Sequence, residues 1–230
     1  MDADVMTTDG VGVLCLQGGR ELTPPCEEMD RSVLERSDGN VVVLAGAARP
    51  GSDYAGASAR AVAHYRTLGA TVSVVHDPRD DVFEALDALT DDVGLIVMPG
   101  GSPGGLLDVL SVVDGGSIGR RLVELWRAGT AISGASAGAM VMCSSTVTPD
   151  RSDGAAAGLG LVAGLAIPHW SPGSERRWAV SASPLWGLPE CGGVLVAGEH
   201  ITAVGQGNPS VQIDGEWQRV SRSGTDPLPT

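Results

Sequence analysis

The chain has 230 residues and a formal net charge of −13. So acidic a surface disfavours nucleic-acid backbones and anionic membranes as partners, because both attract clustered Lys and Arg. The hydrophobic fraction of 43% is ordinary for a soluble globular protein, and this length can bury a full core. We therefore expect one domain over residues 1–230, with flexible tails at 1–10 and 221–230.

The spacing of the cysteines and the composition of the first residues indicate which cofactors and which cellular compartment to expect. None of the four cysteines forms a Cys-x-x-Cys pair, so we expect no zinc site and no other cofactor. Residues 1–10 are polar and acidic and lack the basic and apolar regions of a signal peptide. No apolar run approaches the ~20 residues that span a bilayer. We expect a cytoplasmic protein.

Short apolar runs alternate with helix-like stretches through residue 135. The runs are continuous, as in strands buried on both faces of a parallel sheet: Val11–Leu16, Val41–Ala45, Thr71–Val75, Val93–Met98 and Ala131–Ser133. Between them, helical spacing of apolar residues marks Ser58–Leu68, Val82–Leu89 and Ile118–Arg127. The repetition predicts an α/β fold with a doubly wound, mostly parallel, flavodoxin-like sheet.

The pattern changes in the last third of the chain. Residues 150–164 are rich in Gly and Ala and predict a loop. Two short strands are expected at Gly193–Ala197 and Ile201–Val204. A hairpin is expected at Val211–Ile213 and Glu216–Val220, turning at Asp214-Gly215.

A Gly-x-Ser-x-Gly motif, residues 134–138, directly follows the strand expected at Ala131–Ser133. Ala137–Cys143 then reads as a helix, so the motif lies in the strand–turn–helix context of a nucleophile elbow. The turn would present the Ser136 hydroxyl outward. The Ala137 amide, at the helix N-terminus, would stabilise an oxyanion. A turn that merely holds a serine is the alternative.

A second glycine cluster, residues 99–105, follows the strand expected at Val93–Met98. The carboxyl ends of parallel strands collect active sites, so the bare amide of Gly100 or Gly101 is a candidate second oxyanion donor. A phosphate-binding loop or a plain turn are the alternatives. The segment lacks the Gly-Lys-Ser/Thr of a Walker loop.

A serine nucleophile needs a base, and the chain has four histidines. His169 lies in an irregular segment after an apolar run, where loops commonly carry catalytic groups, and we prefer it to His200. His64 reads as a helix-face residue, and His76 precedes the elbow. Glu199 is the preferred candidate for the carboxylate that orients the base. The other carboxylates that remain open are Glu175, Asp150 and Asp153.

Several motifs together resemble the dipeptidase E and cyanophycinase family of serine peptidases, which has a class I glutamine amidotransferase-like fold. They are Leu16-Gln17-Gly18-Gly19, Val97-Met98-Pro99-Gly100-Gly101-Ser102-Pro103, Gly134-Ala135-Ser136-Ala137-Gly138-Ala139, and Gly158-Leu159-Gly160-Leu161-Val162 followed by Pro168-His169-Trp170. The likeness runs from about Leu14 to Val204. Pro-His-aromatic is closer to the dipeptidase branch than to cyanophycinases.

The resemblance implies a Ser-His-Glu triad of Ser136, His169 and Glu199. The family acid usually sits one residue nearer the Thr-Ala pair at 202–203, where this chain has His200. It also implies substrate contacts by Ser102 and Trp170, and by two arginines, Arg176 and Arg177, that suit a substrate carboxylate. The alternative, which we weigh equally, is that Arg176 and Arg177 are ordinary surface residues without a role in binding.

These residues predict a serine hydrolase that cleaves small peptides by acyl transfer. The expected substrate has a free N-terminus and an acidic first residue, and a homodimer is one assembly that we consider. An acyl-enzyme ligase or cyclase, and a non-catalytic binding domain of the same fold, stay open. An ordinary α/β-hydrolase, with His200 as base and Glu175 or Glu190 as acid, fits less well, and a glutamine amidotransferase would need Cys at position 136.

Overall fold

We describe a computed structural model of the chain over residues 10–37, 40–111, 117–149, 154–174, 182–224 and 226–229. Its main sheet has eight strands in the order β14-β11-β10-β1-β5-β4-β2-β3. Five of them, β1 (Leu14–Gln17), β2 (Asn40–Val43), β3 (Thr71–Val74), β4 (Leu95–Met98) and β5 (Ala131–Ala135), pair in parallel. The predicted doubly wound, mostly parallel sheet is confirmed.

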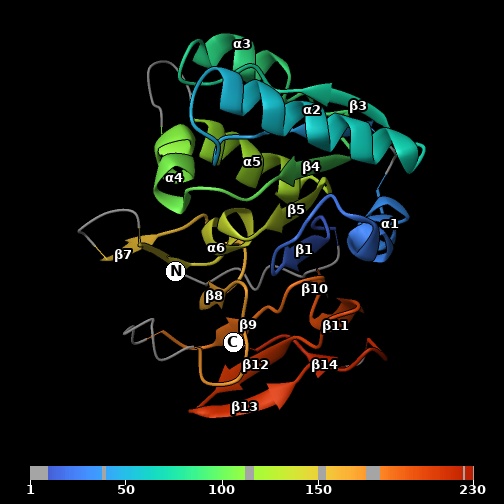
Figure 1. Cartoon of the computed structure of the whole chain (residues 1–230), viewed down its shortest axis with the longest axis vertical. Coiled ribbons are helices and arrows are strands. Elements are labelled where there is room, and N and C mark those ends of the chain that lie inside the picture. The colour runs from blue at the N-terminus through green and yellow to red at the C-terminus, as the bar shows by residue number, and fades with distance from the viewer. Residues whose placement is uncertain are drawn as a thin grey trace, which may run out of the picture.

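Three antiparallel strands extend this sheet on the β1 side. They are β10 (Gly192–Ala197), β11 (His200–Gly205) and β14 (Asp226–Pro227). The strand β14 pairs with the first residues of β11, so part of the segment expected as a free tail is instead held in the sheet. Figure 1 shows the C-terminal strands gathered at one end of the long axis of the molecule.

Helices cover both faces of the main sheet, because successive strand residues point to opposite sides. Leu14 and Leu16 of β1 pack in the larger core, and Cys15 packs in the smaller one. The smaller core lies under α1 (Glu27–Leu34) and α2 (Ser52–Thr67). The larger core lies under α3 (Val82–Asp87), α4 (Pro103–Ser111), α5 (Ile118–Arg127) and α6 (Ala137–Met142).

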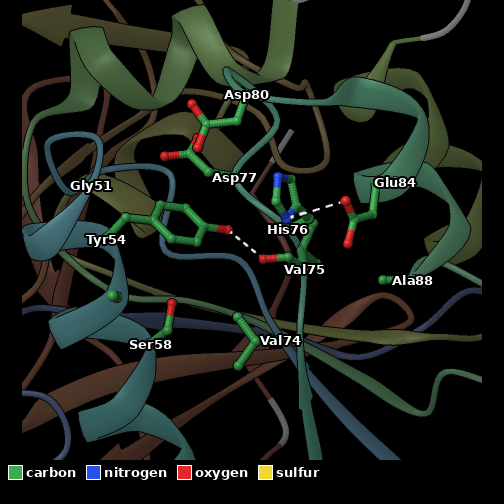
Figure 2. A pocket seen from close by; sticks show the side chains of 11 residues that line it. Gly51, Tyr54, Ser58, Val74, Val75, His76, Asp77, Asp80, Glu84 and Ala88 are labelled. Carbon is green, nitrogen blue, oxygen red and sulfur yellow. Dashed lines mark hydrogen bonds and ion pairs between the residues drawn. The ribbon is translucent and has the colours of Figure 1, made fainter.

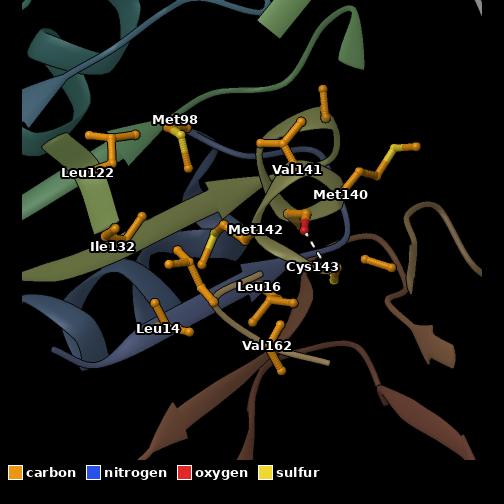
Figure 3. Packing of buried hydrophobic residues seen from close by; sticks show 14 of the residues in the cluster. Leu14, Leu16, Met98, Leu122, Ile132, Met140, Val141, Met142, Cys143 and Val162 are labelled. Atoms are coloured by element: carbon orange, nitrogen blue, oxygen red, sulfur yellow. Dashed lines mark hydrogen bonds between the residues drawn. The ribbon is translucent and has the colours of Figure 1, made fainter. Parts of the chain in front are cut away.

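Figure 3 shows how α6 is buried against the strands. Met140, Val141 and Met142 lie among side chains of β1, β4 and β5, and every residue of α6 is buried. Burial raises the pKa of the Cys143 thiol, just after the helix, to about 12. Apolar packing therefore holds α6 in place, and with it the first turn of the helix, which directly follows the elbow.

Smaller sheets complete the fold. One is formed by β8 (Leu165–Ile167), β9 (Leu185–Gly187), β12 (Ser210–Ile213) and β13 (Glu216–Arg219), and the last two are the predicted hairpin. The other pairs β6 (Ser145–Thr148) with β7 (Gly154–Ala157), and β7 lies inside the stretch 150–164 predicted as a loop. A short 3-10 turn, η1 (Pro24–Cys26), precedes α1. Neither α1 nor α4 is marked by a helical pattern that we recognised in the sequence.

Candidate active site

Ser136 occupies a strained turn between β5 and α6. Its φ of 50° and ψ of −109° lie outside the regions that non-glycine residues ordinarily occupy. Such strain persists only where the surroundings hold it, and it is typical of a nucleophile elbow. The Ser136 amide donates to the Gln17 carbonyl at 2.9 Å, which ties the turn to the end of β1.

The two glycines of the elbow motif are required by close backbone approach. A Cβ added to Gly134 would lie 2.5 Å from the carbonyl carbon of Gly138, and one added to Gly138 would lie 2.2 Å from the Met98 oxygen. Both distances are far inside van der Waals contact. The motif is therefore explained by the packing of the first turn of α6 against β4 and β5.

His169 reaches Ser136 from the loop after β8. Its Nε2 lies 3.2 Å from Ser136 Oγ, at the long end of hydrogen-bond distance. His169 also has a left-handed backbone, with φ of 52°. For Nε2 to accept the serine proton, the ring must carry its hydrogen on Nδ1. The pair thus has the geometry of a nucleophile and its general base.

Glu190 lies on the other side of the imidazole. Its Oε1 is 3.4 Å from His169 Nδ1, and its Oε2 is 3.9 Å from Arg20 Nε. The contact to Nδ1 is longer than a good hydrogen bond, as catalytic contacts often are before substrate binds. A carboxylate at this position would hold the Nδ1–H tautomer and stabilise the imidazolium that forms during catalysis.

Glu190, and not the predicted Glu199, is the glutamate that lies beside His169. The two glutamates flank opposite ends of β10, which runs antiparallel to β1. Gly193 pairs with Gln17 at the carboxyl end of β1, beside the elbow, whereas Val196 pairs with Leu14 at its other end. Glu199 follows β10 and therefore lies at the amino end of β1, which is the end of the parallel strands opposite to Ser136.

Three consecutive carbonyls, from the last residue of β1 onward, hold the three segments of the site. The Gln17 carbonyl accepts from Ser136 N at 2.9 Å, and the Gly18 carbonyl accepts from His169 N at 2.8 Å. The Gly19 carbonyl accepts from the amide of Cys191, next to Glu190, at 3.1 Å. Gly19 also lies against the imidazole, since an added Cβ would be 2.3 Å from His169 Cε1.

The expected oxyanion donors are not equivalent. The Gly100 amide donates to the Glu21 carboxylate, with N to Oε1 at 2.8 Å. Among the described residues, no hydrogen-bond acceptor is found for the amides of Gly101 or Ala137. Gly101 has a φ of 151°, and its Cα lies so close to Ala47 that a Cβ would be 2.3 Å from the Ala47 oxygen.

The predicted substrate contacts are placed as follows. The Ser102 hydroxyl accepts from the Gly105 amide at 2.8 Å and so caps α4. Trp170 packs against Trp217 of β13 in the four-stranded sheet, with ring centroids 4.9 Å apart. Neither contact places these side chains against Ser136. Arg176 and Arg177, and the alternative acids Glu175, Asp150 and Asp153, lie outside the described residues.

The other histidines lie away from Ser136. His76 Nδ1 is 3.5 Å from Glu84 Oε2, in a separate cavity of about 500 Å³ at the end of β3. Figure 2 shows this pair facing Tyr54, whose hydroxyl donates to the Val75 carbonyl. His200 is the first residue of β11, at the edge of the sheet that carries Glu199.

A buried polar cluster joins α1 and α2 to the strands that carry the site. Gln17 Nε2 donates to Asp30 Oδ1 at 2.8 Å and to Ser133 Oγ at 3.0 Å. The Tyr65 hydroxyl donates to Asp30 at 2.9 Å, and His64 Nε2 lies 2.7 Å from Oδ2. Burial, and then the charge of Asp30, raise the pKa of Tyr65 well above its ordinary value. His64 is thus a structural residue.

In the described ranges, no three His, Cys, Asp or Glu side chains are grouped as metal ligands. No helix in those ranges is both long and apolar enough to span a bilayer.

Three comparisons place these features among known proteins. A sequence model of peptidase family S51 matches residues 25–204. A search of curated proteins found no match. Fifteen chains of solved structures match. One is a peptidase from an acI-B1 actinobacterium, with 20% identity over 93% of this chain and 95% of that chain and a TM-score of 0.76. Another is a putative peptidase E protein from Listeria monocytogenes EGD-e, with 15% identity over 86% and 100% and a TM-score of 0.63.

Proposed function

Because this chain belongs to peptidase family S51 and is accordingly a serine peptidase, we propose that it hydrolyses short peptides through an acyl-enzyme on Ser136. His169 is the general base, and Glu190 orients it. The observation that carries this proposal is the 3.2 Å approach of His169 Nε2 to Ser136 Oγ in a strained elbow. The family match also confirms the resemblance to the dipeptidase E family seen in the sequence motifs.

The reaction begins when His169 Nε2 takes the hydroxyl proton as Ser136 Oγ attacks the scissile carbonyl carbon. The carbonyl π electrons move to the oxygen, and the proposed donors to the resulting oxyanion are the amides of Ala137 and Gly101, which have no acceptor among the described residues. Collapse of this intermediate breaks the C–N bond. The imidazolium gives its proton to the leaving amine, while Glu190 stabilises the positive ring.

Water completes the cycle by attacking the acyl-enzyme with His169 again acting as base. The second tetrahedral intermediate collapses to release the acid and to return the proton to Ser136 Oγ. The His169 side chain is 52% exposed, which supports water as the acceptor rather than a peptide amine. We therefore favour hydrolysis over ligation or cyclisation, and a small peptide of the dipeptidase E type as substrate.

A serine-directed fluorophosphonate tests the nucleophile without knowledge of the natural peptide. We expect a single label on Ser136, located by peptide mass spectrometry, and none on Ser136→Ala. Labelling of another residue, or none in the wild-type protein, would contradict the proposal. His169→Gln should slow labelling by about 10²–10⁴-fold, the usual contribution of a general base.

The two glutamates around β10 offer a matched pair of variants for the acid. Glu190→Gln keeps the shape of the side chain but removes the charge that stabilises the imidazolium, so it should slow labelling at least 10-fold. Glu199→Gln makes the same change at the far edge of the sheet and should leave the rate within about 2-fold. Equal effects of the two substitutions would exclude Glu190 as the orienting carboxylate.

A further inference from the structure

We propose that Glu21 binds the free α-ammonium group of the substrate, so that the enzyme cleaves the bond after the first residue of a peptide. This inference rests on the proposed function of Ser136 and names a specificity residue for it. Glu21 lies in the loop after β1 and between two left-handed residues, Arg20 and Leu22, with φ of 58° and 60°. The chain thus turns sharply on both sides of this glutamate.

The carboxylate of Glu21 lies next to the nucleophile. Its Oε1 accepts from Gly100 N at 2.8 Å. A Cβ added to Gly100 would be 2.7 Å from that oxygen and 3.0 Å from Ser136 Cβ. Glu21 and Ser136 therefore approach the same point beside Gly100, where the added methyl group of an alanine would collide with the carboxylate and crowd the serine.

The charge of Glu21 has no cationic partner in the described parts of the chain. One neutral amide holds Oε1, and the neighbouring Arg20 extends toward Glu190 instead, at 3.9 Å. A half-buried carboxylate without a counter-ion favours binding of a cation. A primary ammonium fits, because it can donate to Oε2 while Oε1 keeps its hydrogen bond to Gly100.

A cavity of about 640 Å³ adjoins this carboxylate. Glu21, Pro99 and Gly100 line it, and Gly100 adjoins Ser136; the remaining walls come from the loop before η1 and from η1, α1 and α2. Its volume is within the range of small-molecule sites and exceeds the needs of a single amino-acid residue. The first residue of a peptide can therefore enter with its side chain in the cavity and its amine at Glu21.

Covalent geometry explains why the α-ammonium is the cation that suits Glu21. In a peptide, the α-nitrogen lies about 2.5 Å from the carbonyl carbon of the same residue, two bonds away. A carboxylate that binds the α-ammonium of the reacting residue must therefore lie beside the nucleophile, as Glu21 does. The ammonium of a lysine side chain would be several bonds farther away.

The same placement makes Glu21 unfavourable for blocked or internal residues. The carboxylate stands close to the oxygen that becomes negative in the transition state, and like charges repel strongly in a partly desolvated site. An α-ammonium between them offsets the repulsion, whereas an N-acyl group cannot. Glu21 should therefore favour free-amine ligands and also oppose N-acylated ones.

The test uses boronic acids, which bond to an active serine and imitate the tetrahedral intermediate. The probes are 1-aminoethylboronic acid and its N-acetyl derivative, each measured by its protection of Ser136 against the fluorophosphonate. Wild-type protein should bind the free amine at least 10-fold more tightly. Glu21→Gln should weaken the free amine about 10- to 100-fold and leave the N-acetyl compound unchanged or tighter.

Glu28→Gln is the matched control, since it removes one exposed carboxylate of α1 that does not line the cavity. It should keep the wild-type ratio of the two affinities. Normal phosphonate labelling of Glu21→Gln, with a ratio still at the wild-type value, would overturn the role of Glu21 alone. Equal affinities in the wild-type protein, or no protection by either boronate, would also overturn it. Absence of Ser136 labelling in the wild-type protein would contradict the proposed function itself.

Discussion

Substitution of Gly19 by alanine should inactivate the enzyme although it replaces no reacting side chain. The new Cβ would lie 2.3 Å from His169 Cε1 and 2.7 Å from Nδ1, whereas ordinary contacts begin near 3.4 Å. The ring must then retreat by about 1 Å, and a displacement of that size can cost about 10²-fold in rate. We expect phosphonate labelling of Ser136 to slow by that factor or more.

Backbone strain has to be separated from this collision. Gly19 has a φ of 135°, which an alanine adopts only at a cost of about 1–3 kcal/mol. Gly69→Ala is the control, because Gly69 also has a left-handed φ, of 92°, but nothing lies within 4 Å of its added Cβ. Urea unfolding measures the strain in both variants. If Gly19→Ala labels as fast as Gly69→Ala, His169 is not held against Gly19 as described.

Two further predictions concern stability. Asp30→Ala should lower the free energy of unfolding by about 3–5 kcal/mol, because it leaves the buried donors of Gln17 and Tyr65 without their acceptor; a loss below 1 kcal/mol in urea unfolding would contradict this. Burial raises the pKa of Cys15 and Cys143 from 9.0 to about 12, so stability should be fully present below pH 9 and fall as the pH rises toward 12, by at most about 1.4 kcal/mol per pH unit for each thiol. Cys143→Ala should flatten that fall, and an unchanged slope would exclude the thiol as a cause.

The parallel half of the fold is predictable because its signals are local. Continuous apolar runs such as Val93–Met98 mark buried strands, and α5 begins and ends at the residues that its spacing indicates. By contrast, α4 begins inside the glycine cluster at Pro103. Its first residues, Pro-Gly-Gly, suggest a loop, and the packing of the helix against α5 and α6 overrides the weak helix propensity of the two glycines.

Ser136 and His169 are the parts of the proposed site that the sequence indicates, because each lies in or next to a recognisable motif. Glu190 lies next to no recognisable motif. Its role depends on the direction of β10 in the sheet, and the sequence of a short run such as Gly193–Ala197 does not show whether the strand runs parallel or antiparallel to β1. Its one signal is its place directly before β10. Glu21 was missed because its contact is with a backbone amide 79 residues away.

The row of carbonyls from Gln17 to Gly19 also governs when this enzyme can first act during its synthesis. Ser136 leaves the ribosome well before Glu190, and the loop of Glu190 is held only once β10 has paired with β1. Domains generally fold as units during synthesis, so we expect the sheet to form only after β10 has emerged. A nascent chain thus carries its nucleophile but not the completed site, and peptide cleavage becomes possible only when the polypeptide is nearly finished.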